Sequence, residues 1–467
     1  MKNRVTKILL ILTICITSSV FSQITVNSLS ELMPYLDDNN VSVKLKPGAY
    51  SITAEDVANG LYRKEVKLKN LSKVLLLFEG NNSTYDFTGV TLNIDTKVLQ
   101  AYGKIQVHEL QIIGNNNVLK NLTMVDNGSV HDAPSRRATN IVMDGSHNRI
   151  EGFHVTTKGS FPYGYGDAFG KGGKTVIKHR KHSACLIRGE SNHLKDSKFI
   201  HKSYGHCIFM QGANNPIIEG CNVIGEVRKT DDMLKETSGP AYDVGFMTVW
   251  GYKLPKGYML STGEAGIRAY NGGETIIDGK EFRRGTSNPT VLNCTIKYMR
   301  TGVTIAHATG KKYVEGCKAI ACENGFSLGS GEAVNCSADC VFGPVYSTTY
   351  ERDKNYNAEI TILPPSEPYC NGSGSVAYIG GSEHKITFHG TDEVVEKGLV
   401  IKVGGQKGNI RLLYGNFPHQ NDFEGSNFKL NNFSNYPVKL SNKSFGVKVK
   451  SSGKVTDLGN SNKVTKI

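Results

Sequence analysis

The sequence predicts an all-β protein folded as a single-stranded parallel β-helix with long loop insertions on one face. The first observation is a repeated pattern of apolar residues, a Gly and, three positions later, an Asn, around Gly114, Gly145, Gly189 and Gly212. Gly189 and Gly212 are 23 residues apart, a spacing typical of solenoid repeats. The second observation is that the apolar runs are about five residues long and rich in Ile, Val, Leu and Phe, which suits strands and is too short for helices.

The third observation is the residue type that follows each run. Gly and Asn adopt the left-handed backbone conformation of tight turns at low cost. Coils of strand and turn, stacked at the sheet spacing of roughly 4.8 Å, place equivalent residues above one another. A β-sandwich with coincidental spacing is the alternative, and the recurring Gly and Asn positions favour the β-helix.

Residues 1–22 have the composition of a secretory signal peptide. Lys2, Arg4 and Lys7 precede an apolar run over 8–16, and cleavage is expected after Ser22. The run is short for a membrane span, and no Cys stands at the cleavage position to carry a lipid. We therefore expect an exported protein, periplasmic or secreted.

The segment 23–345 is predicted to be the β-helix domain, beginning with an N-terminal cap. An amphipathic stretch over 26–36 is expected to cover the open end of the solenoid with a short helix. The first strand is expected within 43–50, and further early strands at 74–78 and 91–94.

Coils are then expected over about 105–225 and again from Pro289, where Gly302 and Gly325 are once more 23 residues apart. Residues 346–467 are predicted to form either terminal coils or a small C-terminal β domain.

Two segments without periodicity, 158–180 and 226–288, interrupt the coils. Both are rich in Gly, aromatic and basic residues, and the second holds the only Trp, Trp250. In a solenoid such insertions project from one face, which is commonly the binding face.

The formal net charge of +13 favours a polyanionic partner. For an exported protein we expect an acidic polysaccharide or oligosaccharide substrate rather than nucleic acid, and we expect the protein itself to be a monomer. A basic surface with no specific partner is the alternative. Of ten Cys, one leaves with the signal peptide. The others, including Cys221, Cys294, Cys317 and Cys336 at repeat-like positions, predict a column of buried thiols rather than a disulfide frame or a metal site.

The repeat register predicts a ladder of polar side chains on the outer face of one sheet. The residue before each repeat Gly, or at the aligned position of a later coil, is Asp144, Arg188, Gln211 and His307. Alternation along a strand places this position opposite to the apolar column one residue earlier. A solvated outer face would also be polar, but this ladder is expected to lie between the two insertions.

Near the start of the same strands stand Lys181 and His182 on one coil and Tyr204 and His206 on the next. Histidines in a groove suit proton transfer because their pKa lies near working pH. The alternative for each His is a turn residue hydrogen-bonded to the backbone.

With these residues, the signal peptide and segments such as Ser203–His206 and Arg228–Leu234, the chain resembles the right-handed parallel β-helix enzymes of Bacteroidetes that act on polysaccharides. The resemblance spans about residues 40–345 and implies a carbon–oxygen lyase acting on a uronate polymer such as ulvan, or a dehydratase of a terminal uronate. In such chemistry a cation neutralises the uronate carboxylate, a base removes the C5 proton and an acid protonates the leaving oxygen at C4. The candidate catalytic residues are Lys181, His182, Arg188, Tyr204 and His206, and the candidate substrate-binding residues are Gln211, Arg228, Arg268, Tyr270 and His307.

A glycoside hydrolase and a non-catalytic carbohydrate-binding solenoid are the other possibilities. A hydrolase needs two carboxylates across a groove, for which Asp167, Asp231, Asp232, Asp243 and Glu264 are available. Some enzymes of the resembled kind use Ca²⁺ in place of arginine. Because acidic clusters near the predicted groove are sparse, no cofactor and no essential metal are expected here.

Overall fold

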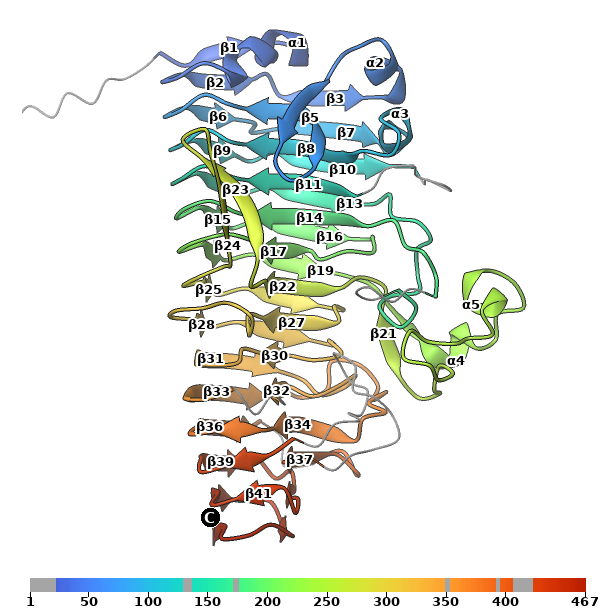
Figure 1. Cartoon of the computed structure of the whole chain (residues 1–467), viewed down its shortest axis with the longest axis vertical. Helices are drawn as coiled ribbons and strands as arrows, with labels where there is room; N and C mark the ends of the chain where they lie inside the picture. Colours follow the sequence, from blue (N-terminus) through green and yellow to red (C-terminus); the bar gives the residue numbers. More distant parts are fainter. Residues whose placement is uncertain (1–21, 129–136, 171–175, 349–352, 392–394, 406–422) are drawn as a thin grey trace, which may run out of the picture.

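The structure is a computed structural model that describes residues 22–128, 137–170, 176–348, 353–391, 395–405 and 423–467. The chain winds into coils that stack along the long axis of the molecule (Figure 1). Strands pair with the strand one coil earlier and one coil later, and this pairing between coils is parallel; an antiparallel hairpin lies at the N-terminal edge of one of the long sheets. The predicted parallel β-helix is confirmed, because a β-sandwich would pair its strands mainly antiparallel. Nearly all of the predicted signal peptide lies outside the described residues.

Three ladders of strands form the three faces of the stack. The face that carries the candidate site is a 14-stranded sheet. Its strands are β4 (Lys64–Lys67), β5 (Leu71–Phe78), β8 (Gln106–Ile112), β11 (Ala138–Met143), β14 (His182–Ile187), β17 (Ile208–Met210), β22 (Ala265–Ala269), β27 (Thr301–Thr304), β30 (Phe326–Ser327), β32 (Tyr346–Thr348), β34 (Ser375–Ile379), β37 (Val400–Val403), β40 (Val438–Leu440) and β43 (Val455–Asp457).

The other two faces belong to one 23-stranded sheet, because they merge at a long strand that pairs with both. One of its ladders holds β1 (Ile24–Val26), β2 (Ser42–Leu45), β6 (Thr84–Asp86), β9 (Val118–Lys120), β12 (Arg149–Glu151), β15 (His193–Lys195), β18 (Ile217–Glu219), β25 (Thr290–Leu292) and β28 (Tyr313–Glu315). The second holds β3 (Gly48–Ile52), β7 (Val90–Asp95), β10 (Thr123–Asn127), β13 (His154–Thr157), β16 (Lys198–His201), β19 (Asn222–Ile224), β26 (Thr295–Lys297) and β29 (Lys318–Ile320). They merge at β31 (Gly331–Ala338) and continue as β33 (Tyr356–Ile362), β36 (Lys385–Gly390), β39 (Lys429–Phe433), β42 (Lys448–Ser451) and β44 (Lys463–Lys466).

The repeat Asn residues explain why the coils keep register at one corner. Asn117, Asn148 and Asn192 are buried, and the side-chain oxygen of each later one accepts a hydrogen bond from the backbone N–H of the one before it, at 2.9 and 2.8 Å. Their amide nitrogens donate to backbone carbonyls of the turns. An Asn ladder therefore satisfies turn groups that the strands leave unpaired.

A second corner holds the predicted thiol column. Cys221, Cys294, Cys317 and Cys336 are buried and are not in disulfides. The residues that directly follow these cysteines are paired between successive coils: Asn222 pairs with Thr295, and Thr295 pairs with Lys318. The cysteines themselves therefore occupy equivalent positions in successive coils. The prediction of small buried thiols is confirmed.

The second predicted insertion needs correction, because a regular coil strand divides it. Within 226–288, strand β22 pairs in parallel with β17 and β27 and belongs to the main sheet. Before it come β20 (Val227–Lys229), α4 (Thr230–Met233), α5 (Pro240–Asp243) and β21 (Met259–Ser261); after it comes the hairpin of β23 (Gly273–Ile277) and β24 (Lys280–Arg284).

The two projecting segments pack on each other. Tyr165, Phe169 and Ile177 from the first insertion form one apolar cluster with Met233 and Leu260 from the second. The segment that carries α4, α5 and β21 stands beside the stack (Figure 1).

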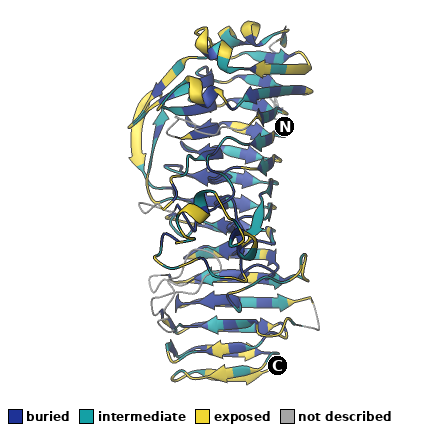
Figure 2. Cartoon of the chain, turned by 90° about the vertical axis from the view of Figure 1, so that its right-hand side faces the viewer, coloured by how far each residue is buried: buried dark blue, intermediate teal, exposed yellow. Residues whose placement is uncertain are grey.

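Short helices lie at the N-terminal end of the solenoid, and strands continue the stack at its C-terminal end. At the N-terminal end lie α1 (Leu29–Leu32) and η1 (Met33–Leu36), with α2 (Ala54–Ala58) and α3 (Val98–Ala101) on later coils. The strands after residue 345 continue both long sheets, and a small sheet of β35 (Gly381–Ser382), β38 (Gly425–Ser426) and β41 (Ser444–Phe445) accompanies them. Figure 2 shows buried strands along the middle of the stack and more exposed residues at its two ends. None of the helices in the described part of the chain combines the length and apolar character that a bilayer crossing requires.

Candidate active site

A cavity of about 550 Å³ lies on the outer side of the 14-stranded sheet. Its floor is formed by side chains of β8, β11, β14 and β17, and its walls by the β4–β5 and β23–β24 hairpins. Of the described residues that line it, five are cationic and two are carboxylates: Lys69, Arg137, Lys181, Arg188 and Arg283, against Glu264 and Glu274. A cavity with this excess of positive charge attracts anionic groups.

At the centre of the cavity four side chains form a connected polar chain. Lys181 Nζ lies 2.8 Å from Glu264 Oε2, and His206 Nε2 lies 3.5 Å from the same oxygen. His206 Nε2 is also 2.6 Å from the Tyr270 hydroxyl. Because Lys181 precedes β14, His206 precedes β17 and both Glu264 and Tyr270 flank β22, three successive coils supply this chain.

The backbone fixes which nitrogen of His206 carries the proton. The N–H of Ala265 donates to His206 Nδ1 at 3.1 Å, so Nδ1 must present its lone pair. Burial, followed by the charges of Arg268 and Lys181, lowers the pKa of His206 to about 3. The ring is therefore neutral at pH 7, with its proton on Nε2 facing the oxygen of Tyr270.

Tyr270 stands in a mixed electrostatic environment. Burial and the charge of Glu264 raise the pKa of Tyr270 to about 12, so it is a phenol at neutral pH. The guanidinium of Arg268 lies 4.5 Å from the centre of the Tyr270 ring. Both this cation and the Nε2–H of His206 would stabilise a tyrosinate, which suits a group that gives up a proton during a reaction.

Glu264 is ionised although it is buried. Burial alone would raise its pKa, but the interactions with His206, Lys181 and Arg268 together outweigh burial and lower the pKa below the usual range of a glutamate. The Lys181–Glu264 pair thus places one anion and one cation beside Tyr270.

A second polar group occupies the N-terminal half of the cavity. Gln111 Nε2 donates to Asp144 Oδ2 at 2.9 Å, and Arg188 Nη1 lies 3.7 Å from that oxygen. Gln111 Oε1 lies 2.8 Å from Nδ1 of His108, whose pKa burial lowers to about 3. Thr275 of the hairpin donates to the other Asp144 oxygen at 2.8 Å.

The predicted register is confirmed on this face. Ile187 pairs with Met210, so that Arg188 and Gln211, the next residues of each coil, are neighbours that both line the cavity. Lys181, His206 and Tyr270 line it as well, and Arg268 stacks on Tyr270 directly beside it.

Four other predicted site residues lie elsewhere. His182 is fully buried inside the coil, because alternation along β14 turns it away from the face that Lys181 occupies. Tyr204 is also buried, with its hydroxyl 2.8 Å from Asp167 Oδ1 and Lys181 Nζ above its ring. Arg228 pairs with Glu236 and Gly164 within the insertions, and His307 follows β27. None of these four residues lines the described cavity.

Several lining residues were missed although the repeat could have found them. Counting six residues back from Gly114, Gly145, Gly189 and Gly212 reaches His108, Thr139, Ser183 and His206, all of which line the cavity. Counting eight back from the first two reaches Gln106 and Arg137, which also line it.

Most of the carboxylates considered for a glycoside hydrolase lie outside the cavity. Of the five acidic residues considered for it, only Glu264 lines the described cavity. Asp167 is ion-paired with Arg300, and Asp231 accepts from the N–H of Gly257 in the projecting segment. Within the described chain, the one group of His and carboxylate side chains with metal-ligand spacing is Glu109, Asp126 and His182, inside the coil and outside the cavity.

Comparison of the sequence with protein-family models finds no match, and comparison with curated proteins finds none either. Among solved structures, a PL6 alginate lyase in complex with a trisaccharide is 14% identical over 94% of this chain and 87% of that chain, with a TM-score of 0.42. The A-module of the mannuronan C-5 epimerase AlgE6 of Azotobacter vinelandii is 10% identical over 91% and 90%, with a TM-score of 0.39. A polygalacturonase from Erwinia carotovora is 10% identical over 95% and 93%, with a TM-score of 0.37. At these values no residue role and no substrate is carried over to this chain.

Proposed function

We propose that this protein is an exported carbon–oxygen lyase that acts on a uronate-containing polysaccharide or oligosaccharide by β-elimination. The observation that carries the proposal is the polar chain Lys181–Glu264–His206–Tyr270 in a cavity where cations outnumber carboxylates. Export would depend on the signal peptide expected at residues 1–22.

The cations would serve the first requirement of the reaction. A uronate carboxylate held by Arg188 and Arg137 has its charge neutralised, which makes the adjacent C5–H more acidic. Bidentate hydrogen bonding by a guanidinium would also orient the sugar ring over the sheet.

Tyr270 would act as the acid. Its phenol donates a proton to the departing O4 while the C4–O4 bond breaks, and the Nε2–H of His206 and the cation of Arg268 stabilise the tyrosinate that remains. The C5 proton would pass to the carboxylate of Glu264, because the ammonium of Lys181 that pairs with it has no lone pair to accept a proton. The electrons of the C5–H bond form the C4=C5 double bond, so the step balances without a redox partner.

The same chemistry serves two kinds of substrate. When O4 is glycosidic the chain is cleaved, and when O4 is the free hydroxyl of a terminal uronate, water leaves and the enzyme is a dehydratase. Ulvan is our proposed polymer from the family resemblance, and alginate, pectate and glycosaminoglycans are the comparison polymers.

The test is a product assay with the mature chain on these four polymer classes. The ultraviolet absorbance of the unsaturated uronate should rise together with new reducing ends if a chain-cleaving lyase is present, and without them if a dehydratase is present. Reducing ends without absorbance would instead identify hydrolysis, with Glu264 and Glu274 as the two lining carboxylates. Absence of any product on all four polymers would contradict the proposal and favour a binding protein.

A further inference from the structure

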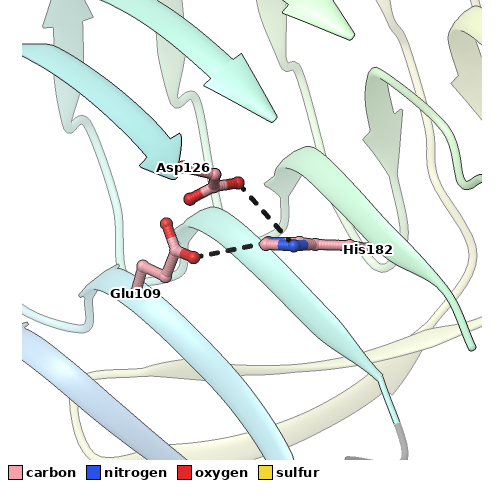
Figure 3. Close-up of side chains that lie close together, drawn as sticks. All are labelled: Glu109, Asp126 and His182. Carbon is pink, nitrogen blue, oxygen red and sulfur yellow. Dashed lines mark ion pairs between the residues drawn. The ribbon is translucent and has the colours of Figure 1, made fainter. Parts of the chain in front are cut away.

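A separate cluster of ionisable side chains lies inside the coil, behind the sheet that carries the cavity. Glu109 of β8, Asp126 of β10 and His182 of β14 point toward one another there (Figure 3). Their side chains are 0 to 1% exposed. The reaction proposed above uses none of them.

His182 faces the two carboxylates without a hydrogen bond to either. Its Nε2 lies 3.5 Å from Glu109 Oε1 and its Nδ1 lies 3.7 Å from Asp126 Oδ2, both beyond the usual 2.7–3.2 Å of an N–H···O bond. Within the described chain, neither ring nitrogen has a hydrogen-bond partner, and Oδ1 of Asp126 has none. Buried polar atoms normally have a partner, so three such atoms in one place are available to a ligand.

The surroundings hold the three side chains in place. The amide nitrogen of Asn140 lies 2.6 Å from Glu109 Oε2 and 3.0 Å from Asp126 Oδ2. Thr157 in turn donates to the Asn140 oxygen at 2.6 Å, and the N–H of Lys158 donates to Asp126 Oδ2 at 2.8 Å. The site is therefore built before any ligand arrives.

The balance of charge also points to a cation. Two carboxylates in a dry interior are costly unless a positive charge accompanies them. The cluster holds two carboxylates and one imidazole within ligand distance of one another, and a bound cation would supply that positive charge.

We propose that Glu109, Asp126 and His182 bind one divalent transition-metal ion, of the Zn²⁺ or Mn²⁺ kind, inside the coil. One imidazole nitrogen and one oxygen from each carboxylate would be the ligands. Two ligands at about 2.1 Å from an ion at a tetrahedral angle lie about 3.4 Å apart, close to the 3.5 Å between His182 and Glu109. The mixed nitrogen and oxygen donors suit these ions, whereas Ca²⁺ takes six to eight oxygens.

The ion would have a structural role. Its ligands come from two faces of the solenoid, because β8 and β14 belong to the 14-stranded sheet and β10 lies on another face; β11 separates β8 from β14. It would thus join the coils directly beneath the N-terminal half of the cavity, and His182 directly follows Lys181.

The test uses the mature chain without a histidine tag, stripped with a strong chelator and then titrated with Zn²⁺, Mn²⁺ or Ca²⁺. We expect one equivalent of Zn²⁺ or Mn²⁺ to bind, measured by elemental analysis after gel filtration, and the Tm to rise on reloading. Failure of both ions to bind and to raise the Tm would overturn the proposal, as would a response to Ca²⁺ alone.

Two variants assign the ion to this cluster. Asp126→Asn preserves shape and should weaken binding at least tenfold and abolish the metal-dependent rise in Tm. Its Tm in chelator should equal or exceed that of the stripped wild type, because a buried charge has been removed. Glu264→Gln, in the cavity, should keep one equivalent of metal; loss of the ion from Glu264→Gln, or full binding by Asp126→Asn, would place the ion elsewhere and overturn the assignment.

Discussion

At the scale of single residues, the proposed elimination depends on which ring nitrogen of His206 carries the proton, and a backbone hydrogen bond determines this. The N–H of Ala265 occupies Nδ1, so the proton on Nε2 faces Tyr270. In the proposed reaction His206 would act through Tyr270 as a positioning residue, which differs from the direct proton transfer that its position in the sequence first indicates. A hydrogen bond from the neutral imidazole to the phenol oxygen lowers the free energy of the tyrosinate that forms when the leaving oxygen takes the proton.

We therefore predict that Tyr270→Phe lowers kcat by about 10² to 10⁴, the usual contribution of a general acid, with little change in Tm. Steady-state kinetics on the preferred polymer measure the first quantity, and thermal unfolding measures the second. Tyr313→Phe on β28, on a different face of the solenoid, is the matched control and should leave kcat unchanged. Equal rates for Tyr270→Phe and the wild type would remove Tyr270 from the mechanism.

For Arg188 the prediction concerns binding. Arg188→Lys keeps the charge beside Asp144 but loses the two-pronged contact with a carboxylate, so KM should rise about tenfold while kcat changes less. Arg149→Lys, on β12 of another face, is the control with an unchanged KM. An unaltered KM for Arg188→Lys would show that this side chain does not hold the uronate.

At the scale of elements, the repeat Gly residues explain why the register of Arg188 and Gln211 could be predicted and why the position of β22 could not. The register of Arg188 and Gln211 follows from Gly189 and Gly212, because a Gly turn fixes where each strand ends. On the next coil Asn271 occupies the position that corresponds to Gly212. Because β22 is not followed by the repeat Gly, the sequence places this strand within a long insertion. Arg268 and Tyr270 could be chosen by residue type, but their place in the sheet could not be predicted.

The hairpin that follows this coil forms one wall of the cavity. Its strands return to nearly the same point, since the N–H of Thr286 donates to the Tyr270 carbonyl at 3.0 Å. Along its length Gly145 donates to the carbonyl of Ile276 at 2.8 Å, and Arg284 contacts two turn carbonyls at 2.9 and 2.7 Å. These contacts hold the hairpin across the ends of the strands rather than in the core.

Replacing residues 273–284 by a short Gly-containing turn should therefore preserve the fold, raise KM about tenfold or more, and reduce kcat less. Circular dichroism checks the fold, and kinetics separate the two constants. Thr275→Val, which removes only the bond to Asp144, is the control for local disturbance. A large loss of kcat at an unchanged KM would contradict the view of the hairpin as a binding wall.

At the scale of the whole molecule, the fold buries histidines of the coils and of the first insertion as neutral groups. Burial lowers the pKa of His206 to about 3, and burial lowers the pKa values of His179 and His201 to about 4. In the unfolded chain these groups titrate near 6.5. Between the two values the unfolded state binds more protons, so stability increases with pH there and falls as pH drops.

Accordingly the free energy of unfolding should decrease from about pH 6.5 toward pH 4, by at most roughly 1.4 kcal/mol per pH unit for each buried histidine. Denaturant unfolding at a series of pH values measures this slope. His201→Gln should reduce it by the share of one histidine, whereas His154→Gln, at an exposed position, should leave it unchanged. A free energy that is constant between pH 7 and pH 4.5 would contradict this reading of the buried rings.

The sequence predicts the architecture better than the site because the two depend on different information. Strand length and Gly turns are local, and they are enough to specify stacked coils and the columns of equivalent residues, such as Cys294 and Cys317. For a residue at the start of a strand, the face on which its side chain lies depends on the residue at which strand pairing begins. For that reason His182, one residue after Lys181, is inside the coil, although both appear equally suited to catalysis in the sequence.

The most direct test of the central claim, elimination within this cavity, is the mass of the oligosaccharides that the mature chain releases from its preferred uronate polymer. The account predicts that products with a new non-reducing end are one water lighter than the corresponding hydrolysis products, and that Tyr270→Phe forms them at least 10² times more slowly. Products carrying the full mass of added water, or light products formed by Tyr270→Phe at the wild-type rate, would contradict it.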